Sequence, residues 1–113
     1  VEGAGGWRVP LHDDLDIQGL AQLLALPVLL VVGLRLGCLN HALLSAQAIQ
    51  ASGLQLVGWV GSQVDPEMSR LTSNLDTLER MMPAPWVGVL PYVAEPDPAT
   101  LAPYLDNRLF TAD

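Results

Sequence analysis

The stretch Val28-Leu29-Leu30-Val31-Val32-Gly33 is apolar throughout and never alternates with polar residues. A strand with one face in water alternates, whereas a strand covered on both faces reads as a continuous apolar run, which is typical of parallel sheets. Pro27 stands directly before the run and ends the preceding element. The stretch therefore predicts a buried strand of a parallel sheet.

The segments on either side alternate between helical and strand patterns. Asp14 or Asp16 is expected to cap the helix before the strand, and Gly53 is expected to close the helix after it. The predicted order is a strand ending at Glu2, a loop and helix over 11–26, strands at 28–33, 54–60 and 86–90, and helices at 40–52, 65–82 and 98–105. This order gives an α/β fold with a doubly wound, mostly parallel sheet.

The composition excludes several classes of function. The chain has 113 residues, enough for at most one domain, and half of them are hydrophobic, so a packed core is well supplied. A net charge of −7 argues against nucleic acid or an anionic membrane as partner. All five cationic residues are arginines, so the chain contains no G-x-x-x-x-G-K-[ST] phosphate loop.

The longest apolar stretch, residues 23–34, is interrupted by Pro27 and is too short to span a bilayer, which takes about 20 residues. No basic region precedes it, so it is not a signal peptide. Cys38 is the single cysteine and cannot form an internal disulfide, which fits a reducing cytoplasm. We interpret it as a small buried hydrophobic residue rather than a reactive thiol.

Glu2 is followed at once by Gly3, Gly5 and Gly6, at the expected carboxyl end of a strand. Glycines let backbone N–H groups approach an anion, and Mg²⁺ usually takes one or two carboxylates together with substrate phosphates. This motif predicts a site for metal and phosphate; the alternative is a tight strand-to-loop turn. Because the chain opens on this motif without a methionine, we expect it to be the C-terminal part of a longer protein.

Ligands of such sheets bind beyond the carboxyl ends of the strands, so we expect a site formed by residues 3–7, 33–40, 61–65 and 91–98. Asn40 opens a helix whose free N–H groups suit an anion, although it can equally be a helix cap. Ser62 and Gln63 either reach a nucleotide base or are turn residues. His12 and His41 lie far apart without ligand spacing, which makes a zinc site improbable.

Four segments together resemble dethiobiotin synthetase: V-E-G-A-G-G-W at 1–7, P-V-L-L-V-V-G-L-R-L-G-C-L-N-H-A-L-L-S-A-Q-A-I at 27–49, G-L-Q-L-V-G-W-V at 53–60 and P-A-P-W-V-G-V-L-P-Y at 83–92. The resemblance covers nearly the whole chain but only about the C-terminal half of the family's domain. It therefore implies that residues 1–113 are the C-terminal half of one P-loop-type domain.

The resemblance also implies an activity. The family consists of cytoplasmic homodimers that act in biotin synthesis, joining CO₂ to 7,8-diaminononanoate and phosphorylating the carbamate with MgATP before the cyclic urea closes. Its P-loop, catalytic lysines and a second metal ligand lie upstream, so this chain holds no catalytic residue and is expected to be inactive alone.

Residue roles follow from the same resemblance. Glu2 would bind Mg²⁺, and Gly3, Ala4 and Gly5 would face the phosphates. The substrate carboxylate would lie against Leu36, Gly37, Cys38, Leu39 and Asn40, contributed across the dimer. The ATP base would contact Ser62, which stands where the family usually has asparagine, together with Gln63, Pro91, Tyr92, Val93 and either Glu95 or Asp97.

Two other functions fit parts of the sequence. A related ligase that amidates cobyrinate-like acids carries a similar E-G-A-G loop, but the L-G-C-L-N-H segment favours the diamine enzyme. A non-catalytic dimerising module that lost its nucleotide-binding half is the other alternative.

Overall fold

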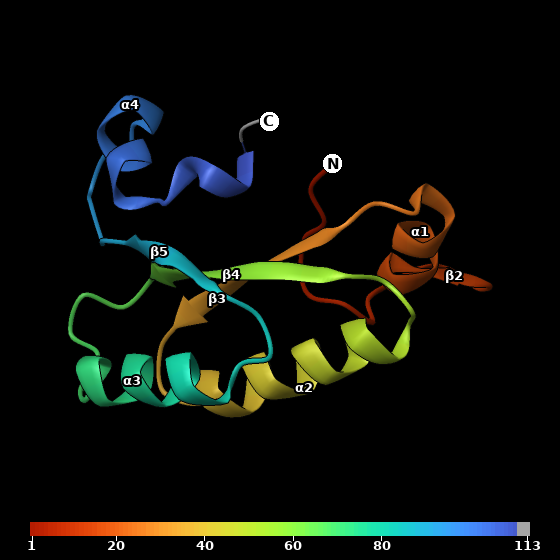
Figure 1. Ribbon diagram of the computed structural model, residues 1–113, viewed down its shortest axis with the longest axis horizontal. Helices are drawn as coiled ribbons and strands as arrows, with labels where there is room; N and C mark the ends of the chain where they lie inside the picture. Colours follow the sequence, from red (N-terminus) through yellow and green to blue (C-terminus); the bar gives the residue numbers. More distant parts are fainter. Residues whose placement is uncertain (111–113) are drawn as a thin grey trace.

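A computed structural model describes residues 1–110 and has an α/β architecture (Figure 1). Its main sheet consists of three parallel strands in the order β3, β4, β5. These strands are β3 (Val28–Leu34), β4 (Leu56–Gln63) and β5 (Trp86–Leu90). The helices are α1 (Ile17–Leu24), α2 (Cys38–Ala51), α3 (Leu71–Met81) and α4 (Pro98–Leu101), and 3₁₀ turns follow at Ala102–Tyr104 and Asn107–Phe110. The predicted α/β fold with a parallel sheet is confirmed.

The layers of the molecule are visible in Figure 1. Helices α2 and α3 lie together on one side of the sheet, and the segment containing α4 lies on the other. The stripe of α2 that faces the sheet consists of Cys38, Ala42, Ala46 and Ile49, spaced three or four residues apart as a buried helical face requires. Trp59 of β4 and Leu78 of α3 complete this core without any exposed surface.

The N-terminal region differs from the prediction. The strand expected to end at Glu2 is not observed, and residues 1–9 belong to no strand or helix. A short antiparallel hairpin follows instead, formed by β1 (Pro10–His12) and β2 (Leu15–Asp16). A strand needs a hydrogen-bonded neighbour, and within the described residues no strand pairs with the segment at Val1, which is 97% exposed.

The start of α3 also differs from the prediction. Asp65 does not cap a helix; its side chain accepts from the N–H of Glu67 at 2.9 Å and its carbonyl from the N–H of Met68 at 3.3 Å. These bonds form a local turn, and the helix begins only at Leu71, after Arg70 in the left-handed conformation (φ 59°). The Asp-Pro pair therefore forms a turn here instead of opening a helix. Met68, which follows the turn, is buried in the core before α3 begins.

The apolar stretch 23–34 is divided between the end of α1 and strand β3, as Pro27 led us to expect. None of the helices that residues 1–110 form has the length and apolar character needed to cross a bilayer.

Candidate active site at the carboxyl ends of the strands

The carboxyl ends of the three strands meet at one edge of the sheet, on the left in Figure 1. In the register of the sheet, Ser62 lies beside Gly33 on one side and beside Leu90 on the other. The loops that follow these strands therefore share one edge, as predicted for residues 33–40, 61–65 and 91–98. Gly61 leaves room near this edge for side chains of the two neighbouring strands, because a Cβ there would stand 3.0 Å from Leu34 and 3.3 Å from Val89.

The loop after β3 leads directly into α2. Helix α2 begins at Cys38, earlier than predicted, and Gly37 occupies the capping position with a φ of 96°. Glycine has no side chain to accept from the first N–H groups of the helix, and no other side chain does so. Asn40 is thus not the cap; it lies exposed in the first turn. An uncapped start of a 14-residue helix is suited to a carboxylate or phosphate.

The loops after β4 and β5 supply the other side of this edge. Ser62 and Gln63 are the last residues of β4 and are half-buried. After β5, Pro91 and Val93 are half-buried, whereas Tyr92 is 51% exposed. This edge therefore offers short polar side chains beside apolar and aromatic surface, a combination typical of small-molecule sites.

Two acidic candidates follow Tyr92. Glu95 is exposed and lies in the loop. Asp97 precedes α4, and its carboxylate accepts from the hydroxyl of Thr100 at 3.1 Å. The Asp97 side chain is thus already engaged in holding the first turn of α4.

The glycine-rich N-terminal loop is anchored elsewhere. Trp7 donates its indole N–H to Gln18 at 2.7 Å and accepts the N–H of Gln18 at 3.0 Å, which ties the loop to α1. Gly5 and Gly6 both have positive φ angles, 86° and 121°. In Figure 1 the N-terminus lies well away from the arrowheads of β3, β4 and β5. The structure therefore brings together three of the four predicted loops.

Glu2, Gly3, Ala4 and Gly5 are all exposed, so their carboxylate and backbone groups are accessible. Across residues 1–110, no three His, Cys, Asp or Glu side chains gather in a way that could hold a metal ion. The residues present would thus supply Mg²⁺ with one carboxylate, and phosphate oxygens, water and other groups would complete its shell. That partial donor set is the kind Mg²⁺ uses with nucleotides.

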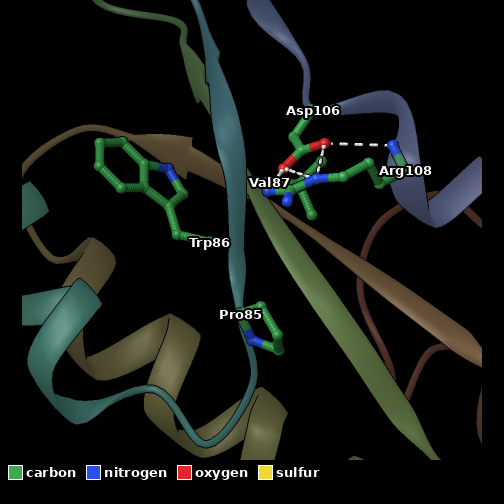
Figure 2. Close-up of a pocket in the computed structure, with 5 residues that line it drawn as sticks. All are labelled: Pro85, Trp86, Val87, Asp106 and Arg108. Carbon is green, nitrogen blue, oxygen red and sulfur yellow. Dashed lines mark hydrogen bonds and ion pairs between the residues drawn. The ribbon is translucent and has the colours of Figure 1, made fainter.

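A pocket of about 240 Å³ lies elsewhere, at the beginning of β5 (Figure 2). Pro85, Trp86 and Val87 line it together with Asp106 and Arg108. The Arg108 guanidinium and backbone N–H both donate to Asp106, which lowers the pKa of that carboxyl to about 2. This pocket lies at the opposite end of β5 from the predicted loops, and no pattern in the sequence pointed to it.

Asn74 of α3 contacts Cys38, and no sequence motif indicated this contact. The position of Asn74 within a helical sequence pattern does not predict this contact, because the two helices that it joins are distant in the chain.

Comparison with models of known protein families assigns the chain to one family. The model of the family described as AAA domain matches residues 1–100. The chain therefore belongs to this AAA-domain family, which is of the P-loop type and has the α/β fold seen here.

Its relatives are more specific, and they confirm the resemblance to dethiobiotin synthetase. The chain is 60% identical over 108 residues to the ATP-dependent dethiobiotin synthetase BioD of Pseudomonas aeruginosa (strain LESB58), covering 96% of this chain and 47% of that protein. It is 57% identical over 106 residues to the protein of the same name from Chromohalobacter salexigens, covering 87% of this chain and 45% of the relative. The chain thus spans about half the length of the curated relatives it matches.

Proposed function

We propose that this chain is part of an ATP- and Mg²⁺-dependent cyclo-ligase that forms the ureido ring of dethiobiotin in biotin synthesis. The observation that carries the proposal is the uncapped start of α2 beside the ends of β4 and β5. It occurs in a chain 60% identical to a protein named as such a synthetase. On this proposal, residues 1–113 form part of a single domain together with the further length that the relatives have.

The reaction proceeds in three balanced steps. One amine of 7,8-diaminononanoate attacks CO₂ and loses a proton, giving a carbamate. A carbamate oxygen attacks the γ-phosphorus of ATP, and ADP leaves with the β–γ bridging oxygen. The second amine then attacks the carbonyl carbon of this mixed anhydride and loses a proton, the C–O bond to phosphate breaks, phosphate leaves, and the cyclic urea is complete.

The residues of this chain bind and orient in that reaction. The end of the loop after β3 and the first turn of α2 would hold the distal carboxylate of the substrate, in residues Leu36, Gly37, Cys38, Leu39 and Asn40. The N–H of Cys38 already donates to the carbonyl of Arg35 at 3.0 Å, so the other N–H groups of this segment would be the donors. Helix N-termini favour anions because their N–H groups are unpaired and the helix dipole is positive there. Holding the far end of the diamine places its amines at a fixed distance from the phosphates, which is the positioning that phosphoryl transfer depends on.

The nucleotide would bind at the other loops. The ends of β4 and β5 would receive the base, with Ser62 and Gln63 as hydrogen-bonding groups and Pro91, Tyr92, Val93 and Asp97 around them. A serine hydroxyl lacks the paired donor and acceptor of an amide, so selectivity for adenine is expected to be relaxed unless Gln63 substitutes. Glu2 would ligate Mg²⁺, which supplies charge neutralisation when bound, and Gly3, Ala4 and Gly5 would face the phosphates.

We further propose a cytoplasmic homodimer. Leu36 and Leu44 are 69% and 56% exposed, on the loop and the helix that hold the proposed carboxylate site. Apolar side chains in such positions suit a second copy of the enzyme, which would close the site across the interface.

The 113-residue chain alone is expected not to make dethiobiotin, because it contains no lysine to neutralise the transferred phosphate. The test is a hybrid enzyme in which the matching segment of the Pseudomonas aeruginosa relative is replaced by this chain. We expect the hybrid to turn over, and the chain by itself to release no product from diamine, CO₂ and ATP.

Glu2 provides the sharper control within that hybrid. Glu2→Ala should reduce turnover most at limiting Mg²⁺, whereas Glu95→Ala should leave the Mg²⁺ dependence unchanged. Undiminished activity of the Glu2→Ala hybrid at limiting Mg²⁺ would contradict the metal role, and an inactive but folded hybrid would contradict the proposed function.

A further inference from the structure

The side chain of Asn74 joins the beginnings of α2 and α3. Its Oδ1 accepts from the thiol of Cys38 at 3.8 Å, and its Nδ2 donates to the carbonyl of Arg70 at 2.8 Å. Cys38 is the first residue of α2 and is 1% exposed, while Arg70 is the residue that precedes α3. One planar amide thus contacts the first residue of one helix and the cap of the other.

Neither of the two helix starts that this link joins has a side-chain cap. Gly37 gives α2 no side-chain cap, and a Cβ built on it would meet nothing within 4 Å. Arg70 gives α3 no side-chain cap either, and it adopts the left-handed conformation that residues other than glycine rarely take. Asparagine is itself a poor residue for a helix interior, so its presence is explained best by contacts outside its own helix.

We propose that Asn74 is a positioning residue: through Cys38 it fixes the first turn of α2, and with it the N–H groups that receive the substrate carboxylate. The inference rests on the proposed function for the carboxylate site, but the contact itself does not. Outside the hydrogen bonds of its own helix, the Cys38 backbone bonds to Arg35 in the preceding loop at 3.0 Å. The Cys38 side chain packs in the core, and Asn74 adds a directional hydrogen bond from α3 to that packing.

The contact is tested on the 113-residue chain by the rate at which iodoacetamide alkylates Cys38. Asn74→Ala should speed alkylation about tenfold, because it removes both hydrogen bonds of the amide, and together they match about one hydrogen bond at the upper end of the usual range for local opening. Thr77→Ala is the matched control, because Thr77 also bonds to a carbonyl four residues back on α3, that of Ser73, at 2.9 Å.

The functional consequence is tested in the hybrid enzyme described above. Asn74→Ala should raise KM for the diamine about five- to tenfold and leave kcat within about twofold, since the turn holds the substrate away from the reacting atoms. Alkylation of Asn74→Ala no faster than that of Thr77→Ala would overturn the positioning role. Faster alkylation with an unchanged KM would keep Asn74 as an anchor of α2 but overturn the carboxylate site, and so separate this inference from the proposed function.

Discussion

The carboxylate of Asp16 accepts two hydrogen bonds at the start of α1, one from a backbone N–H and one from an arginine. One carboxylate oxygen accepts from the N–H of Gly19 at 2.8 Å, which caps the helix, and the other accepts from Arg8 at 2.6 Å. Both contacts lower the pKa of Asp16, the backbone hydrogen bond from Gly19 more than the one from Arg8. The sequence offered Asp14 and Asp16 as alternative caps, and only the folded loop distinguishes them.

Asp16→Asn should retain part of the cap, because the amide oxygen still accepts, whereas Asp16→Ala should lose it and have the lowest urea midpoint at pH 7. The folded pKa lies below the ordinary value of 3.8, so the extra stability of the charged form is complete above about pH 4. It is lost as pH falls through the folded pKa.

The measurement is the urea midpoint of the three proteins between pH 7 and pH 2.5. The unsubstituted chain should lose its advantage over Asp16→Asn on acidification. An advantage that grows at low pH would show that the charge of Asp16 does not stabilise this loop.

The contact between strand β5 and the segment after α4 depends on a single glycine, Gly88. The segment after α4 crosses this strand, with a bridge between Gly88 and Leu105 and a bond from the N–H of Asp106 to the carbonyl of Val87 at 2.8 Å. Gly88 has a φ of 151°, and a Cβ on it would lie 2.2 Å from the carbonyl oxygen of Tyr104. Because this neighbouring atom belongs to the backbone, it cannot rotate aside as the end of a side chain can.

Gly88→Ala should therefore lower the free energy of unfolding by about 2–4 kcal/mol, the sum of conformational strain and forced displacement of the crossing segment. Gly53→Ala is the matched control: Gly53 has a φ of 88°, but nothing lies within 4 Å of its Cβ position. That substitution should cost only the strain, about 1 kcal/mol.

Urea unfolding of both variants gives the comparison, and limited proteolysis shows whether the segment after α4 is released. Equal losses for the two glycines would mean that the close approach to Tyr104 does not constrain β5.

Whole elements differed in how well local patterns predicted them. Strand β5 has the predicted bounds of 86–90, because Pro85 and Pro91 mark both of its ends in the sequence. Helix α3 was predicted to begin at 65 and begins at Leu71, since Asp65 satisfies nearby N–H groups in a turn. Local chemistry alone allows an aspartate to do either.

At the scale of the whole molecule, one edge of the main sheet is unpaired within the described residues. Strand β3 pairs with β4 on one edge, and within residues 1–110 no strand pairs with its other edge. Val31 on this strand is 60% exposed, although the run 28–33 predicted cover on both faces. Unpaired strand edges with apolar side chains favour association with other chains.

We expect the 113-residue chain to self-associate at micromolar concentration, and Val31→Lys to reduce this, because a charge on an edge strand opposes edge-to-edge pairing. Light scattering coupled to gel filtration measures both. Val64→Lys is the control, since Val64 is 50% exposed but lies in the loop after β4. A compact monomer at all concentrations, or equal effects of both substitutions, would contradict the role of the β3 edge.

The sequence by itself determined the class of fold, the order of the elements from α1 onward and the three loops that share the carboxyl edge of the sheet. These follow from apolar runs, helical spacing and the rule that parallel strands end at one edge, all of which are short-range or topological. The family resemblance rested equally on contiguous motifs.

Only the tertiary structure decided which aspartate caps α1, that Gly37 rather than Asn40 occupies the capping position of α2, and that Asn74 reaches Cys38 across 36 positions. It also decided that the N-terminal loop is tied to α1 through Trp7 and Gln18 rather than placed beside the other loops. Each of these depends on which distant groups compete for the same hydrogen bond or the same space, and that competition exists only once the chain has folded.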